Sequence, residues 1–255
     1  MGRITDYPLL VFALSVVVLW IAELVGVSLR RKPEGPEKDE REDLGMLLAG
    51  ALTLLGVIIG FTFSMAVGRY DRREAAEEAE SVAIKAELLK ADLLLAESDA
   101  RKVRGLLRSY LDQRIMFYTA RDANQRQNID ATTAQIESEL WSAIRAPNPM
   151  QLPPLVVVPV SGMTDVFNAE TSTRAAWLSR IPAAAWILML AIAVCCNALI
   201  GYSTHNAQAN AKFFPLILPL IVAIAFFLIA DIDSPRSGVI RVHPQNLEAL
   251  SLSWR

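Results

Sequence analysis

Four long apolar runs, nearly free of charged residues, constrain the fold of this 255-residue chain more than any other feature. They extend over residues 8–29, 44–67, 181–202 and 213–230. An α-helix rises about 1.5 Å per residue, so roughly 20 residues cross the ~30 Å hydrocarbon core of a bilayer. Each run approaches that length. The sequence therefore predicts an all-α membrane protein with four transmembrane helices.

The segment between the second and third runs is polar but carries apolar side chains at helical spacing. Its first part is expected to continue from the second run as an amphipathic helix, with an apolar stripe formed by Ala75, Ala79, Val82, Ala86, Leu89 and Leu93. Further helices are expected over about 98–115, about 124–144 and from 155 into the third run. The predicted organisation is a first transmembrane pair at 1–69, a helical cytoplasmic insert at 70–180, a second transmembrane pair at 181–232 and a cytoplasmic tail at 233–255.

Basic residues near the ends of the runs predict the orientation. Four crossings place the N-terminus, the insert and the C-terminus on one side of the membrane. That side carries eight basic residues near the membrane against six on the other, and the positive-inside bias makes it cytoplasmic. The eight are Arg3, Arg69, Arg72, Arg73, Arg174, Arg180, Arg236 and Arg241, and the six are Arg30, Arg31, Lys32, Lys38, Arg41 and Lys212.

Composition narrows the classes of function. The net charge is −2, and no block of basic residues marks a nucleic-acid surface, so no nucleic-acid partner is expected. Cys195 and Cys196 are adjacent in an apolar run, and the chain has only two histidines. No HExxH, CxxC or GxSxG pattern occurs. We therefore expect no catalytic residues, no metal site and no cofactor.

Small residues form one face of the second run. At about 100° per residue, Ala49, Thr53, Gly56, Gly60 and Ser64 fall on one side of a helix, with Phe63 at its edge. Such a face permits close helix packing of the GxxxG type. It also suits the wall of a pore, where Phe63 would form an apolar constriction. Both interpretations remain open at the level of sequence.

Two further groups of charged residues are candidates for function. Glu23 is the one acid inside a run, and an ionisable group within a membrane is a functional hypothesis by default. Its place near the end of the run also permits hydration or pairing with Arg30 and Arg31. Three arginines follow the second run, where they would either concentrate anions at a pore entrance or anchor to lipid phosphates: Arg69, Arg72 and Arg73.

Several stretches together resemble a known family. They are GFTFSMAVGRYDRREAAEEAE from residue 60, RGLLRSYLDQRI from residue 104, DVFNAETSTRAAWLSRIP from residue 165 and DIDSPRSGVIRVHPQNLEAL from residue 231. The pattern resembles the bacterial bestrophin-like membrane proteins of the DUF4239 type, which are distantly related to bestrophin anion channels. The resemblance implies four spans, a cytoplasmic helical insert and a pentameric anion channel whose second helix lines the pore. Bestrophins carry a proline in the pore segment, whereas residues 56–67 contain none.

These observations favour an oligomeric channel, expected to conduct small anions, with Thr53, Gly56, Gly60, Phe63 and Ser64 lining the pore. The expected partners are the lipid bilayer, further copies of the chain and small ions. The resemblance also implies a bacterial inner membrane, with both termini and the insert in the cytoplasm. The alternative is a nonconducting membrane scaffold or sensor whose cytoplasmic helices bind a partner.

Overall fold

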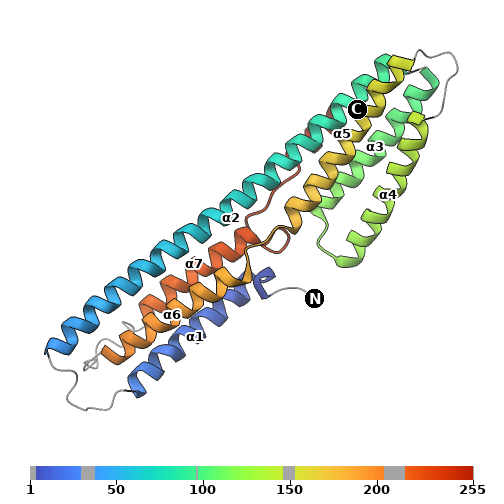
Figure 1. Ribbon diagram of the computed structural model, residues 1–255. Helices are drawn as coiled ribbons and strands as arrows, with labels where there is room; N and C mark the ends of the chain where they lie inside the picture. Colours follow the sequence, from blue (N-terminus) through green and yellow to red (C-terminus); the bar gives the residue numbers. More distant parts are fainter. Residues whose placement is uncertain (1–3, 30–37, 96, 146–152, 204–215, 255) are drawn as a thin grey trace. The chain divides into compact units, whose positions relative to one another are not determined.

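The computed structural model describes residues 4–29, 38–95, 97–145, 153–203 and 216–254, and these residues form helices with no strand among them (Figure 1). The all-helical prediction is confirmed for this part of the chain. The polar break around His205 and the proline-rich linker from 147 to 152 lie outside the described residues, as do Arg30 and Arg31.

The chain divides into two compact units that interleave along the sequence. Unit 1 comprises Met1–Arg69 and Arg180–Arg241, and unit 2 comprises Tyr70–Ser179 and Val242–Arg255. One helix, α2 (Lys38–Leu94), contributes residues to both units. The sequence-based division treats 233–255 as a separate tail, whereas residues from Val242 onward belong to unit 2.

Unit 1 contains most of the apolar sequence. Besides the first part of α2, its elements are η1 (Ile4–Asp6), α1 (Pro8–Ser28), α6 (Ala183–Ser203) and α7 (Ile217–Asp233). Helix α1 packs against both α6 and α7, and those two contact each other much less. An edge-to-face contact joins the rings of Phe12 and Phe227 at 6.2 Å.

Three helical segments are long and apolar enough to cross a bilayer: Pro8–Ser28, Glu42–Leu93 and Val157–Ser203. Helix α7 is equally apolar in sequence but has only 17 residues, or roughly 26 Å of helix. The described structure therefore contains three candidate spans and one shorter apolar helix.

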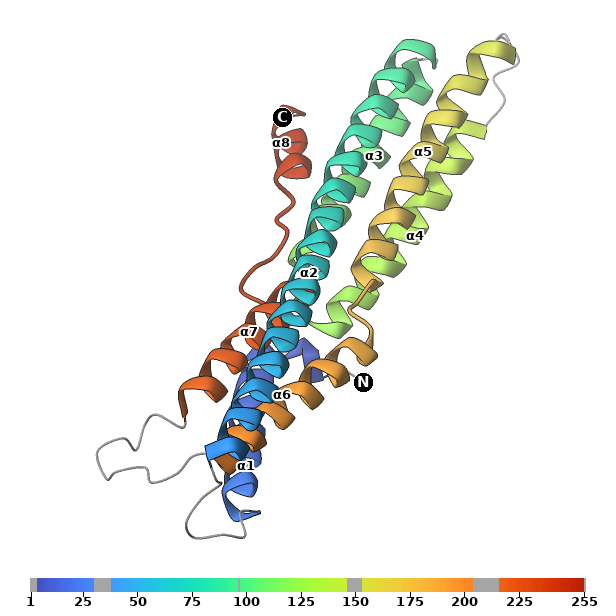
Figure 2. The same ribbon diagram turned by 60° about the vertical axis from the view of Figure 1, so that its left-hand side comes forward.

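Unit 2 is a helical bundle built from the second part of α2, α3 (Glu97–Thr119), α4 (Ala123–Arg145), α5 (Pro153–Leu178) and α8 (Gln245–Ser253) (Figure 2). Helix α4 packs against α3 and α5, and α8 packs on α3. Its apolar core includes Leu107, Leu111, Leu140, Met163 and Val166. At one end of this core the rings of Phe117, Tyr118 and Trp177 contact one another edge to face.

Side chains of α2 and α3 fix α8 in place. The Glu77 carboxylate accepts hydrogen bonds from the Leu247 amide at 2.9 Å and from Asn246 Nδ2 at 2.7 Å, which satisfies donors in the first turn of α8. Arg108 Nη2 donates to the Trp254 carbonyl at 2.6 Å. The last part of the chain is thus an ordered component of unit 2.

Candidate functional site

The small-residue face of α2 is open within the protomer. Thr53, Gly56, Gly60 and Ser64 are all exposed. A Cβ atom added at Gly56 or Gly60 would meet nothing within 4 Å. Phe63 lies on the same open side with 41% of its surface exposed. Close packing against another helix of the same protomer therefore does not explain this face.

The opposite side of α2 is buried. Leu55, Thr62 and Ala66 are exposed by 3%, 1% and 0%. Even so, only 6% of the most apolar stretch of α2 is buried, against 33% for α1. Helix α2 therefore presents most of its membrane-crossing surface to the outside of the protomer.

In unit 2 the exposed side of α2 carries apolar residues among charged ones, which differs from the prediction from sequence. Members of the expected apolar stripe lie outside: Val82, Leu89 and Leu93 are 60%, 60% and 82% exposed. The buried side instead carries four charged residues, together with Ile84 and Ala91. Each is exposed by at most 1%, and the charged ones are Arg73, Glu77, Glu80 and Glu87. Apolar periodicity located the helix but indicated the wrong face as buried.

Close helix packing occurs at two other glycines, on α1 and α6. A Cβ atom at Gly26 would lie 2.0 Å from the Ala198 carbonyl oxygen, and one at Gly201 would lie 2.0 Å from the Glu23 carbonyl oxygen. The two backbones touch there because both residues lack side chains. This crossing was not predicted from the sequence, although small residues one turn earlier, such as Ala22, offered a signal.

The three candidate arginines have different surroundings. Arg72 is exposed, and Arg69 is partly exposed with its Nη1 donating to the Met65 carbonyl at 3.4 Å. Arg73 is 1% exposed and donates to the carbonyls of Ala176 at 3.3 Å and Ser179 at 3.1 Å, at the end of α5. Arg73 thus bonds to backbone groups inside unit 2, and Arg69 and Arg72 remain the candidates for contact with ions or phosphate.

Glu23 lies deeper in the protein than its place near a helix end indicates. The residue is 4% exposed, and its Oε2 atom has no hydrogen-bond partner among the described residues. Hydration of this carboxyl group and its pairing with Arg30 and Arg31 stay predictions, because both arginines lie outside the described residues.

A chain of charged groups joins the four long helices of unit 2; it is buried around Arg114 and partly exposed at Arg174 and Asp130. Glu80 of α2 accepts hydrogen bonds from Arg114 Nε, from the Tyr118 hydroxyl at 3.3 Å and from Thr173 Oγ1 at 3.1 Å. Arg114 Nη1 also donates to Glu170 of α5 at 3.4 Å. Glu170 pairs in turn with Arg174, whose Nη2 lies 3.3 Å from Asp130 of α4. This network was not predicted from the sequence, because its members lie on four helices and are far apart along the chain.

Burial perturbs the ionisation of carboxyl groups near this network. Burial raises the pKa of Glu137, and repulsion from Glu170 adds to the effect. The pKa of Glu87 is raised to about 8, first by burial and further by Asp165, while Lys90 opposes the shift. Glu87 is fully buried, and neither of its carboxyl oxygens has a hydrogen-bond partner among the described residues.

The acids at the end of α7 are structural. The Asp231 carboxylate accepts hydrogen bonds from the amides of Val239 at 2.7 Å and Ile240 at 2.8 Å. The Asp233 carboxylate accepts one from the Ile181 amide at 3.2 Å. Both side chains are nearly fully buried. They hold the chain segments that follow α7 and precede α6.

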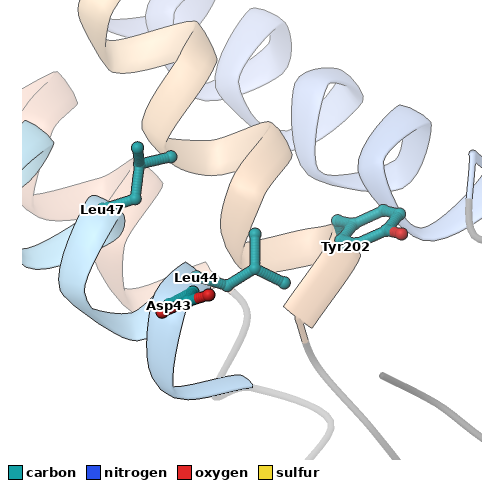
Figure 3. A pocket seen from close by; sticks show the side chains of 4 residues that line it. All are labelled: Asp43, Leu44, Leu47 and Tyr202. Carbon is teal, nitrogen blue, oxygen red and sulfur yellow. The ribbon is translucent and has the colours of Figure 1, made fainter. Parts of the chain in front are cut away.

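A shallow pocket of about 330 Å³ lies in unit 1 between the start of α2 and the end of α6. Leu44 points from α2 toward Tyr202 of α6, and Asp43 and Leu47 complete the lining (Figure 3). Within the described ranges, no group of three or more His, Cys, Asp or Glu side chains is placed to hold a metal ion. The pocket combines one acid with apolar groups and offers no recognisable catalytic arrangement.

The sequence model of one protein family, described as the Bestrophin-like domain, matches residues 10–247 of the chain. The chain belongs to the Bestrophin-like family. The resemblance inferred from the sequence motifs is thereby confirmed, and the family match extends through both units.

Solved structures share the Bestrophin-like fold. A crystal structure of a bacterial bestrophin homologue from Klebsiella pneumoniae, carrying one mutation, matches with a TM-score of 0.64 at 11% identity, covering 95% of this chain and 97% of that one. A second variant of that homologue matches with a TM-score of 0.63 at 10% identity, covering 94% and 96%. No curated protein sequence matches the chain. At this level of identity the structures establish a shared fold.

Proposed function

We propose that this Bestrophin-like protein is an ion channel formed by several copies of the chain, with α2 lining the pore. The observation that carries the proposal is the open small-residue face of α2. A long apolar helix that crosses a membrane must pack against protein, lipid or a water-filled axis. Thr53 and Ser64 would offer hydroxyl groups to a permeating ion, and Gly56 and Gly60 would leave room for it.

Exposed apolar side chains in unit 2 also support an assembly of several copies. Val82, Leu89 and Leu93 of α2 are 60%, 60% and 82% exposed. Contacts between neighbouring copies would cover these side chains, which a single copy leaves open.

The charge distribution supports small anions as the permeating ions. Residues 44–68 of α2 contain no acidic side chain, so the proposed wall carries no negative charge. Arg69 and Arg72 follow directly, and Arg72 is exposed. Positive charge at a pore entrance raises the local concentration of anions.

We further propose four transmembrane helices, with α7 as the fourth, in a bacterial inner membrane. Both termini and unit 2 then face the cytoplasm, as the excess of basic residues on that side favours. A membrane-impermeant thiol reagent tests this orientation on Ser98→Cys, placed in the water-accessible part of unit 2. If the introduced cysteine is labelled only after the cells are permeabilised, the cytoplasmic orientation is supported. If it is labelled in intact cells, the orientation is contradicted.

Chloride flux through liposomes containing the purified protein tests the channel. Phe63→Ala should raise the flux because it removes an apolar constriction from the proposed wall. Phe61→Ala is the matched control: it removes the same side chain two residues away, about 200° around the helix. Phe61 and Phe63 are 69% and 41% exposed, so neither substitution opens a cavity in the core.

Equal effects of the two substitutions would place the constriction elsewhere. Absence of flux in the wild type and both variants, together with a monomeric protein in mild detergent, would favour the alternative of a nonconducting scaffold or sensor. Five copies in a closed ring is the assembly that we propose, following the family resemblance.

A further inference from the structure

The carboxyl group of Glu23 is enclosed in an apolar part of unit 1. The residue is 4% exposed, and Oε2 lacks a hydrogen-bond partner among the described residues. It lies about 8 Å from the end of α1, counted as helix rise to Ser28. An oxygen buried in this way needs a hydrogen-bond partner.

A second unpartnered oxygen lies on the facing helix. Asn197 of α6 is fully buried, and its Nδ2 donates to the Ala193 carbonyl at 2.7 Å, while its Oδ1 has no partner. Asn197 precedes Gly201 by one turn, on the same face of α6. Gly201 is the residue whose added Cβ would lie 2.0 Å from the Glu23 carbonyl oxygen. Both unpartnered oxygens thus belong to one helix crossing.

No charged group in the described neighbourhood balances an ionised Glu23. Helix α6 contains no Asp, Glu, Lys or Arg, and its titratable side chains are Cys195, Cys196 and Tyr202. The acids of α7 are Asp231 and Asp233, which accept backbone hydrogen bonds at its far end. Asp6 of η1 pairs with Arg180. A carboxylate buried here would carry an uncompensated charge, which is costly in an apolar interior.

We propose that Glu23 is a proton-binding site of the membrane unit, holding its proton as a neutral carboxyl that donates to the Asn197 amide oxygen. An ionised carboxylate only accepts hydrogen bonds, so it would leave both oxygens without a donor. A carboxyl group supplies the one donor that the crossing lacks. Loss of the proton then requires water to enter between α1 and α6. Proton binding is thereby coupled to the distance between these two helices.

Labelling by dicyclohexylcarbodiimide, an apolar reagent that reacts with protonated carboxyl groups, tests the site. The full-length protein in lipid vesicles is treated across a pH series, and the peptide that contains Glu23 is quantified by mass spectrometry. Labelling should be strong at neutral pH and fall by up to about tenfold per pH unit above the midpoint of titration. Glu97, whose side chain is 87% exposed, serves as the internal control and should remain weakly labelled throughout.

Two results overturn the proposal. One is the absence of labelling at Glu23 at every pH while the protein remains folded. The other is protection of Glu23 by Na⁺, but not by choline at equal ionic strength, because a carboxylate that binds a metal cation would then occupy the crossing. Neither readout depends on ion flux, so the site and the proposed channel stand or fall separately.

The variant Glu23→Gln provides a second measurement. The amide of glutamine can donate to the Asn197 oxygen but cannot lose a proton, so the variant mimics the proposed state. Raising the pH should lower the thermal unfolding temperature of the wild type more than that of the variant. Identical pH profiles, with unfolding fully resolved in both proteins, contradict a titrating Glu23.

Discussion

At the scale of single residues, the interior of unit 2 depends on charged groups that hold one another. Arg114 is fully buried and lies between Glu80 and Glu170, with its guanidinium 4.5 Å from the centre of the Phe117 ring. Such a network stabilises the fold only while every member has its partner. Its contribution is best described as specificity: it determines which faces of four helices meet.

Arg114→Met should destabilise the protein by about 3–5 kcal/mol, because it leaves the buried Glu80 carboxylate without its cation and removes one of the two cations beside Glu170. Arg104→Met is the control. It removes a pair with Asp92 at 2.6 Å whose side chains are 53% and 34% exposed, and it should cost about 1 kcal/mol or less. Denaturant unfolding in detergent gives both values. Equal losses would mean that the buried network contributes no more than a surface pair.

Glu87 makes the stability of unit 2 dependent on pH. Its pKa in the folded protein is about 8, above the ordinary 4.5. The folded state therefore holds a proton that the unfolded state releases, so the contribution of Glu87 to stability is complete below about pH 4.5, falls as pH rises and is lost above about 8. Glu87→Gln should flatten this part of the profile in thermal unfolding. A variant profile as steep as the wild type would assign the titration to another group.

At the scale of the helices, two kinds of glycine have opposite roles. Gly26 and Gly201 allow α1 and α6 to touch, whereas Gly56 and Gly60 face open space. Glycine in an apolar helix therefore lies at a close helix contact in α1 and α6 but on an open face in α2. A sequence pattern of small residues does not distinguish the two.

Gly26→Ala and Gly56→Ala separate these roles. The first should destabilise the protomer by about 1–3 kcal/mol, because the new Cβ meets backbone atoms of Ala198 that cannot rotate away. The second should leave the protomer unchanged or stabilise it by up to about 1 kcal/mol through helix propensity. Thermal unfolding in detergent measures both. A large loss with Gly56→Ala would indicate that the open face is filled in the purified assembly.

The sequence predicted the existence and type of most helices but not all of their faces. Uncharged runs and three-to-four-residue spacing are local properties, and α3 and α4 lie close to their expected ranges. The burial of Glu80 and the exposure of Leu89 depend on which helices surround α2, and that information is spread over distant segments. The proposed pore residues were found from a local pattern, whereas the pairing of Glu23 with α6 required the tertiary structure.

At the scale of the whole molecule, the exposed surface of α2 supports the proposed association. Its most apolar stretch is largely uncovered, and in unit 2 Val82, Leu89 and Leu93 are exposed as well. Exposed apolar surface of this kind is typical of contact with lipid or with another protein surface. In a closed ring of copies, the exposed faces of α2 from all copies surround one axis.

Particles of the purified protein in mild detergent should therefore show closed rotational symmetry, with five copies as the proposed number. Single-particle images and mass by light scattering measure this directly. Gly60→Trp, placed where nothing lies within 4 Å in the protomer, should preserve the helical content but change the assembly or block flux. A monodisperse monomer that leaves α2 uncovered would contradict the ring.

The interleaving of the two units sets an order of events during synthesis. Helix α1 leaves the ribosome roughly 150 residues before α6, the helix it touches at Gly26. At about 5–20 residues per second, that interval lasts on the order of 10–30 seconds. During this time α1 has neither α6 nor α7 to pack against, so Glu23 faces lipid or the insertion machinery. A proton on that carboxyl would then matter first for membrane insertion, before any channel exists.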